Sequence, residues 1–350
     1  IVFFCKPDSG YRFMMITWAD MIGAVSGMNE QGLTVTINAA KSPVPFKATT
    51  PVAILAREIL QYAGDINQAV RISEKRKLFV SESLLVSSPA DGKAVIIEKS
   101  PEKYDVVMPE NDHIVCANHF QGDVFSNDKR NLENIRGSDS RYRSERISEL
   151  LAREDKLNVY DAVTILRDRM GRGGVDPGMG NPLAVNQLIA HHAVVFSPSD
   201  LLVWVSTSPY QLGKFVAYDL KKVFSESISK DSLNREIIEP GLTIAADTFL
   251  FSREYSNYEK YLKMTGELMN YSRNGNKIPD SFENSYIETN PMLYLTYFNL
   301  GNYFYETGSY KRAYDYYQMA LSKDVAGEAE REKILRLAQK ALKKQRNVHS

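Results

Sequence analysis

The fold of this chain is decided by one stretch of its sequence, Gly27-Met28-Asn29-Glu30-Gln31-Gly32-Leu33-Thr34-Val35-Thr36-Ile37-Asn38. Leu33, Val35 and Ile37 alternate with threonines, and this period of two is typical of a strand with one buried face. The segment before them, residues 29–32, is polar and ends in glycine, which favours a turn. The stretch therefore predicts two strands joined by a tight turn, within a fold built on antiparallel sheets.

Further strands are indicated on both sides of this hairpin. Residues 1–4 and 11–18 are apolar runs, and the turn at residues 7–10 contains proline and glycine. Three later runs predict a second antiparallel sheet, and two near-continuous apolar runs predict a last pair of strands covered on both faces. These later strands are expected at residues 83–88, 94–99 and 113–120, and at residues 188–196 and 201–206.

Two pairs of helices alternate with the strands. Pro51 marks the start of a helix that ends at Gly64, and Asp65 caps a second helix that runs toward Lys77. Another pair of helices is expected between residues 138 and 170. The order of sheets and helix pairs predicts an α+β fold, a four-layer αββα sandwich. A doubly wound sheet would instead alternate single helices with parallel strands.

The character of the chain changes after about residue 222, where a polar stretch begins and clear strand patterns end. The expected divisions are a domain at 1–222, a linker at 223–239 and an all-α region at 240–350. Within this region, the helices expected at residues 294–323 resemble a tetratricopeptide repeat (TPR). Small residues at Gly301 and Ala313 would let the two helices approach while aromatic side chains fill the space between them. A helical hairpin of another kind remains an open alternative.

The composition excludes several classes of function. Lys and Arg number 43, as do Asp and Glu, so the formal charge is zero and no nucleic-acid partner is predicted. No apolar run approaches the roughly 18–20 residues that cross a bilayer, so no membrane span is predicted. Cys5 and Cys116 lack the spacing of a metal or redox motif, and the adjacent His191 and His192 would point to opposite faces of a strand. Neither a metal nor a cofactor is therefore predicted.

Four motifs carry a resemblance to a known family. They are the hairpin at residues 27–38, the segment Cys116-Ala117-Asn118-His119-Phe120, the segment Ser138-Asp139-Ser140-Arg141-Tyr142, and residues 188–220, which end in WVSTSPYQLGKFVAYDL. Their order and content resemble the N-terminal-nucleophile (Ntn) amide hydrolases, which include the choloylglycine (bile salt) hydrolases and the autoprocessing penicillin acyltransferase-like enzymes. The resemblance covers residues 1 to about 222 and is closest to the acyltransferase-like branch.

The resemblance implies a hydrolase or acyltransferase that acts on a linear, non-peptide amide. Such enzymes use an N-terminal Cys, exposed by autoprocessing, whose own α-amino group moves the proton. Asn38 matches the family's oxyanion-binding Asn, and Asn118 matches a second Asn that orients the amino end of the nucleophile. Arg141 matches a helix-start Arg whose charge would favour the thiolate. The implied substrate is a small-molecule acyl amide, and we expect the amides of Asn38 and Asn118 to point into one shared cleft.

The chain departs from the family pattern at its beginning. The family's nucleophile Cys and a following Arg-Asn-x-Asp motif lie well upstream of the hairpin, and no such motif occurs between Ile1 and Gly27. We therefore expect the nucleophile to lie upstream of this chain, and the chain alone to be inactive toward amides. Cys5 is an alternative nucleophile, whereas Cys116 in an apolar run fits a buried small side chain.

Two other functional readings stay open. In the first, the same sandwich is a non-catalytic binding protein whose helical region contacts a protein partner. In the second, Cys116 and His119 form a Cys-His hydrolase, although a spacing of three along a strand would put them on opposite faces. The glycine-rich loop at residues 171–180 is interpreted as a pocket rim. The resemblance is to bacterial-type enzymes of cytoplasm or cell envelope, and since no targeting segment is present, the compartment stays unassigned.

Overall fold

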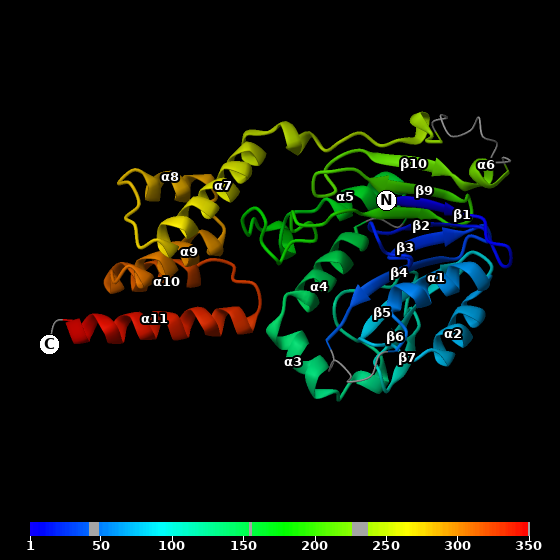
Figure 1. Cartoon of the computed structure of the whole chain (residues 1–350), viewed down its shortest axis with the longest axis horizontal. Coiled ribbons are helices and arrows are strands. Elements are labelled where there is room, and N and C mark those ends of the chain that lie inside the picture. The colour runs from blue at the N-terminus through cyan, green and yellow to red at the C-terminus, as the bar shows by residue number, and fades with distance from the viewer. Residues whose placement is uncertain (42–48, 154–155, 226–236, 349–350) are drawn as a thin grey trace.

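The computed structural model describes residues 1–41, 49–153, 156–225 and 237–348. Antiparallel sheets with their covering helices form one part of the molecule, and five long or medium helices near the C-terminus form the other (Figure 1). The expected α+β fold is confirmed. None of the described helices is both long enough and apolar enough to span a membrane.

The first seven strands form one antiparallel sheet in which every strand pairs with its neighbour in sequence. The predicted hairpin at residues 27–38 is confirmed as β3 and β4, with Gly27 opposite Val35. The prediction that residues 83–99 start a second sheet is wrong, because β5 pairs directly with β4. The strands are β1 (Val2–Cys5), β2 (Phe13–Ile16), β3 (Ser26–Asn29), β4 (Thr34–Ala39), β5 (Glu82–Ser88), β6 (Lys93–Lys99) and β7 (Tyr104–Val107).

The helix pair between β4 and β5 explains why these strands are neighbours. Helices α1 (Val52–Tyr62) and α2 (Ile66–Lys75) form a hairpin, and the Asp65 side chain caps α2 by accepting from the Gln68 amide. Because the two helices run out and back, the chain returns to the end of the sheet where it left and enters β5 antiparallel to β4. The apolar sides of the helices cover one face of the sheet, where Leu55 and Ile59 pack with Val35 and Val86.

A smaller antiparallel sheet packs on the opposite face. It contains β8 (Val194–Ser197), β9 (Leu202–Ser206) and β10 (Phe215–Asp219), in the order β10-β9-β8. Val203 and Val205 of β9 pack with Met14 of β2 and Met28 of β3, so the two sheets share a core. Trp204 on the other side of β9 packs in a cluster with Val163 of α5 (Val159–Leu166).

Two predicted strands are wrong in extent. Residues 113–120 form no β-ladder, because side-chain hydrogen bonds hold this extended segment in place. The strand predicted at 188–196 begins only at Val194, since Leu188 has a φ of 52°, a left-handed conformation that strands exclude. The sequence analysis also missed β7 and α3 (Lys129–Gly137), whose cap is Asp128. The helix α4 (Ser140–Leu151) lies in the predicted region, and the short α6 (Leu220–Ser225) follows β10.

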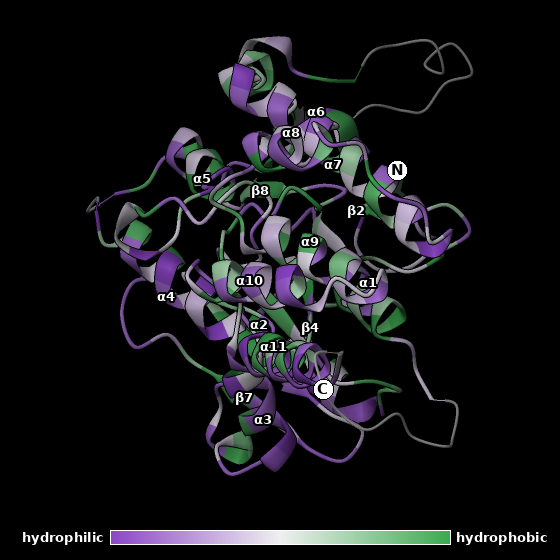
Figure 2. Cartoon of the chain, turned by 90° about the vertical axis from the view of Figure 1, so that its left-hand side faces the viewer, coloured by the Kyte–Doolittle hydropathy of each residue, from purple (hydrophilic) through white to green (hydrophobic). Residues whose placement is uncertain are grey.

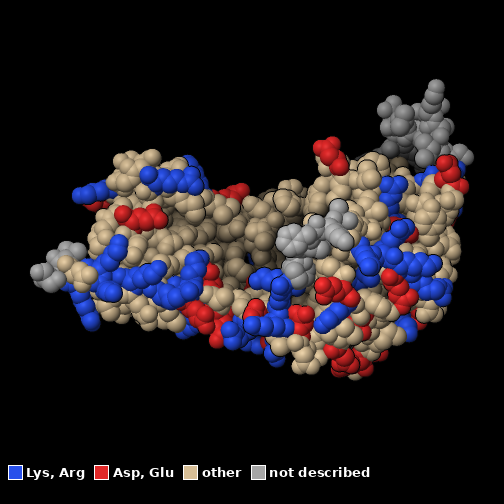
Figure 3. Space-filling model, turned by 60° about the horizontal axis from the view of Figure 1, so that its bottom comes forward, with Lys and Arg blue, Asp and Glu red and all other residues tan. Residues whose placement is uncertain are grey.

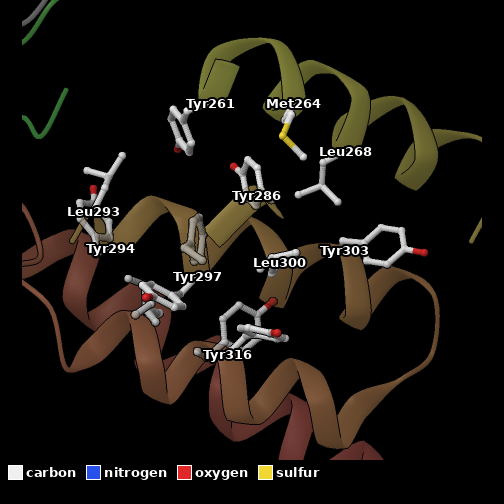
Figure 4. Packing of buried hydrophobic residues seen from close by; sticks show 14 of the residues in the cluster. Tyr261, Met264, Leu268, Tyr286, Leu293, Tyr294, Tyr297, Leu300, Tyr303 and Tyr316 are labelled. Atoms are coloured by element: carbon white, nitrogen blue, oxygen red, sulfur yellow. The ribbon is translucent and has the colours of Figure 1, made fainter. Parts of the chain in front are cut away.

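The C-terminal helices share an aromatic core. Tyr261, Tyr286 and Tyr297 point into the space between the helices (Figure 4), and the rings of Tyr261 and Tyr286 stack with centroids 5.3 Å apart. The last helix has both hydrophilic and hydrophobic residues (Figure 2), and Ile334, Ala338 and Ala341 are buried in the shared core. The helices are α7 (Arg253–Arg273), α8 (Phe282–Thr289), α9 (Tyr294–Glu306), α10 (Tyr310–Leu321) and α11 (Glu328–Val348).

The glycine-rich loop and the end of α3 are among the places where the sheet-containing part packs against the helical region. The backbone of Gly178 approaches Leu293 so closely that a Cβ atom would lie 2.3 Å from the Leu293 nitrogen. The Asn181 amide donates to the Asp324 carbonyl at 2.9 Å, so the glycine-rich loop is a docking surface for the helices. Gly327, before α11, lies against the carbonyl of Gly137 at the end of α3. The proposed division at residues 1–222, 223–239 and 240–350 stays a prediction, and residues 226–236 lie outside the described part.

We predict opposite effects for two glycine substitutions in the helical region. A Cβ at Gly301 would lie 2.6 Å from the Tyr317 ring, so Gly301→Ala should destabilise the protein by about 1–3 kcal/mol. Gly266 in α7 has open space around it, so Gly266→Ala should stabilise the protein by up to about 1 kcal/mol. Urea unfolding of both variants measures the difference. Equal free energies of unfolding for the two would contradict the close approach of α9 and α10.

Candidate active site

A row of polar side chains crosses the middle of the seven-stranded sheet. Strand pairing places Asn38 of β4 opposite Ser83 of β5, and Ser83 opposite Glu98 of β6. Their neighbours Ile37, Leu84 and Ile97 belong to the core under α1 and α2. Because successive side chains alternate between faces, the polar row lies on the face away from these helices.

Hydrogen bonds from this row hold the segment of residues 114–122 over the sheet. The Asn38 side-chain amide donates to the Cys116 carbonyl at 3.3 Å. The Glu98 carboxylate, which is fully buried, accepts the backbone N–H of Gln121 at 2.7 Å and that of Gly122 at 3.0 Å. Burial raises the pKa of Glu98, although the two N–H donors act in the opposite direction. Side chains therefore replace the β-ladder that this segment was predicted to form.

Asn118 is fixed by contacts from three directions. Its side-chain amide donates to the Ala39 carbonyl at 3.1 Å, and its backbone N–H donates to the Ser140 hydroxyl at 2.7 Å. The Asn134 amide donates to the Asn118 carbonyl at 2.7 Å. The bonds from Asn38 to residue 116 and from Asn118 to residue 39 are reciprocal. The structure thus brings the two predicted asparagines together on adjacent segments.

The two arginines at the start of α4 have different surroundings. Arg143 is 17% exposed; its Nη2 donates to the Asn118 side-chain oxygen at 2.8 Å, and its Nε donates to Asp139 at 2.7 Å. Arg141, the residue singled out from the sequence, is 68% exposed and pairs with Glu145 at 2.9 Å. Of the two, Arg143 is the one with a hydrogen bond to Asn118.

His119 and Ser140 form a buried pair next to Asn118. The His119 Nδ1 lies 2.7 Å from the Ser140 hydroxyl, which also accepts the Asn118 N–H. Burial, followed by the positive charges of Arg141 and Arg143, lowers the pKa of His119. The ring is therefore neutral at pH 7, and the pair links the Asn118 segment to the first turn of α4.

A cavity of about 550 Å³ opens beside these residues. Asn118, Asp139, Ser140, Arg143 and Gln187 are among the residues that line it. Asn38 does not line this cavity, so the shared cleft predicted for the two asparagines stays a prediction. The arrangement offers amide donors and one guanidinium to an oxygen that carries negative charge. His191 and His192 instead line a separate cavity of about 380 Å³, next to Ile1 and Thr17.

Neither described cysteine has the environment of an activated nucleophile. Burial and the nearby charge of Glu98 raise the pKa of Cys116 to about 12. Cys5 packs against the core under α1 and α2, on the face of the sheet opposite Asn38, and burial raises its pKa as well. A thiol with a raised pKa is a weak nucleophile at neutral pH because little thiolate is present.

Part of the chain matches a known family. Residues 2–174 match the family model of acyl-coenzyme A:6-aminopenicillanic acid acyl-transferase. The region matched includes Asn38, Asn118 and both arginines.

Three individual proteins are similar to this chain. A variant of conjugated bile acid hydrolase from Clostridium perfringens is 14% identical, with a TM-score of 0.40, over 63% of this chain and 82% of that one. The N-acylethanolamine-hydrolyzing acid amidase ortholog of Caenorhabditis elegans is 16% identical, with a TM-score of 0.37, over 59% of this chain and 79% of that one. An uncharacterized protein of Archaeoglobus fulgidus is 24% identical over 140 residues, which are 33% of this chain and 23% of that protein. The chain thus spans about a quarter of that last relative.

We predict that Glu98 is required to hold the Asn118 segment. Glu98→Ala would leave two backbone N–H groups without acceptors, so the protein should lose about 2–4 kcal/mol of its free energy of unfolding. Hydrogen exchange at Gln121 and Gly122 should also become faster. Glu102→Ala, an exposed position after the same strand, is the control and should change neither quantity by much. Unchanged exchange at Gln121 and Gly122 in the Glu98 variant would contradict the role assigned to Glu98.

Proposed function

We propose that this chain is the main part of an Ntn amide hydrolase or acyltransferase that acts on a linear, non-peptide acyl amide. In this proposal the nucleophile is an N-terminal Cys encoded upstream of Ile1 and exposed by autoprocessing. One observation supports it above all: the Asn38 amide donates to the Cys116 carbonyl and the Asn118 amide donates to the Ala39 carbonyl, so the two segments are held together, and Asn118 lines a cavity with Arg143. These groups lie in the part of the chain that matches the acyltransferase family.

The asparagine amides retain hydrogen-bonding capacity for a substrate. An NH₂ group has two N–H donors, and the bonds to the carbonyls of Cys116 and Ala39 use one from each. Among the described residues the second donor of each amide has no acceptor and could serve an oxyanion, and removal of such a donor typically costs about 10²- to 10³-fold in rate. The positive charge of Arg143 would favour a thiolate near Asn118.

The proposed reaction follows from these groups. The thiolate of the N-terminal Cys adds to the amide carbonyl carbon, and the carbonyl oxygen becomes an oxyanion that accepts from the asparagine amides. The α-amino group, with a pKa of about 7.7–8.0, passes the thiol proton to the leaving amine as the C–N bond breaks. Water, or an amine acceptor, then attacks the thioester and releases the acyl group as an acid or a new amide.

The finer architecture is part of the same proposal. Three interfaces support a four-layer αββα sandwich. Helices α1 and α2 pack on the large sheet, the two sheets pack face to face, and α5 packs on the small sheet. The close approach of α9 and α10 at Gly301, with Ala313 and Ala320 buried, supports a TPR-like unit in residues 240–350. A groove of about 240 Å³ between α7 and α9 is where a protein partner of that unit would bind.

A non-catalytic binding protein is the competing function. The raised pKa values of Cys5 and Cys116 agree with this function, which needs no nucleophile, and equally with an enzyme whose nucleophile lies elsewhere. The coding sequence upstream of Ile1 discriminates between the two. A Gly-Cys junction followed about 15–20 residues later by Arg-Asn-x-Asp supports the enzyme, and an upstream sequence without these motifs supports the binding protein.

Expression of the chain with its upstream residues tests the activity directly. Mass spectrometry should detect cleavage before the Cys, and the processed protein should hydrolyse acyl amides. Alkylation of the new N-terminal Cys should abolish turnover. The 350-residue chain alone should be inactive, so hydrolysis by this chain that Cys5→Ala stops would overturn the proposal.

We predict unequal roles for the two arginines in the processed enzyme. Arg143→Gln removes the hydrogen bond to Asn118 and should lower kcat/KM by about 10²-fold. Arg141→Gln removes an exposed charge paired with Glu145 and should have an effect of less than tenfold. The reverse order would show that Arg141, as the family resemblance implies, is the arginine that acts in the site.

A further inference from the structure

Another cavity, of about 300 Å³, lies near the start of α3 and takes no part in the proposed amide chemistry. Most of its lining residues come from the segment just before β5, the segment just after β6, and residues 120–130. Its lining combines a buried hydroxyl, two aromatic rings and four cationic side chains. These are, in that order, Ser81, then Phe120 and Phe125, then Lys41, Lys103, Lys129 and Arg130.

Ser81 provides a buried hydrogen-bonding group without a partner. The residue is 1% exposed, and its hydroxyl has no hydrogen-bond partner in the described part of the chain. Ser81 continues the β5 ladder, since its carbonyl accepts the Ala40 N–H, and it precedes Ser83 by two residues. Its side chain therefore points to the face covered by residues 114–125, where the cavity lies. A buried hydroxyl left unpaired costs about 1–3 kcal/mol, so a ligand atom that pairs with it would be stabilised.

The charge around the cavity is predominantly positive. Four cations face two carboxylates, Glu102 and Asp128, and the Asp128 side chain already accepts the backbone N–H groups of Arg130 and Asn131. Within the described ranges, none of the four cationic side chains forms an ion pair. Lys and Arg side chains gather in patches on the face of the molecule turned forward in Figure 3. An anion at this cavity would accept charge-assisted hydrogen bonds from these cations, which no carboxylate of the described residues accepts.

The aromatic wall indicates that the anion carries an apolar group. The rings of Phe120 and Phe125 stack with centroids 4.1 Å apart, and both side chains are buried. An apolar body of the size of one aromatic ring fits within the volume and would contact the edges of these two rings that line the cavity.

We propose that this cavity binds a small organic anion. The anionic head lies between Lys129, Arg130 and Lys103, the apolar body lies against Phe120 and Phe125, and a polar atom of the ligand pairs with the Ser81 hydroxyl. The site is separate from the one that contains Asn118 and Arg143, and it does not depend on the proposed amide hydrolysis.

Binding to the full 350-residue chain tests the proposal. Ligand-observed NMR titrations at low salt use three probes: benzoate, phenyl phosphate and the neutral benzamide. At least one of the two anions should bind saturably with one site, and benzamide should bind at least tenfold more weakly. The comparison of benzoate with phenyl phosphate identifies the preferred head group.

Three variants locate the binding. Lys129→Gln combined with Arg130→Gln should weaken anion binding by about tenfold, and because both side chains are exposed, the fold should be kept. Ser81→Ala should weaken anion binding by about threefold or more. Lys340→Gln combined with Lys343→Gln, on the exposed side of α11, is the control with the same loss of charge and should leave affinity unchanged. The proposal is overturned if neither anion binds, if benzamide binds as tightly, or if the control pair has the same effect as the pair at α3.

Discussion

The candidate site depends on one buried carboxylate. Glu98 lies inside the protein, where no cationic side chain of the described residues bonds to it, and it accepts two successive backbone N–H groups from the segment of residues 114–122. That segment has no β-ladder of its own, so the side chains of Glu98, Asn38 and Asn118 attach it to the sheet through hydrogen bonds. In this position the Asn118 carbonyl accepts from Asn134 of α3, and the Asn118 backbone N–H donates to Ser140 of α4.

Local patterns predicted much of the fold, because strand alternation and helix caps depend on neighbours in sequence. The hairpin at residues 27–38, the cap at Asp65 and the aromatic helices near the C-terminus are all visible in this way. The assignment of strands to sheets was partly wrong, since only long-range pairing shows that β5 joins β4. The segment at 113–120 has the apolar composition of a strand, but its partners are side chains, which periodicity does not detect.

The site itself was predicted in part. The resemblance to a family led to Asn38 and Asn118, which the structure brings together, whereas Arg143 and Ser140 were missed. Arg143 lies two positions after Arg141 on the same helix, so the two point in different directions, and sequence alone does not tell which one faces Asn118. The position of Glu98 in the sequence did indicate that its side chain is buried and hydrogen-bonded. It is a charged residue directly after four apolar ones in β6, a position where burial requires a hydrogen-bonding partner.

The neighbour-to-neighbour pairing of β1 to β7 has a consequence for the order of folding. Pairs of adjacent strands close short loops, which is entropically inexpensive, so we expect much of this sheet to form early. The bonds that build the site join residues 78 and 79 positions apart, across both α1 and α2. These contacts become favourable only after β4, β5 and β6 have assembled the surface that receives the segment. Competence for chemistry would therefore be a late event in folding, acquired after the sheet is already in place.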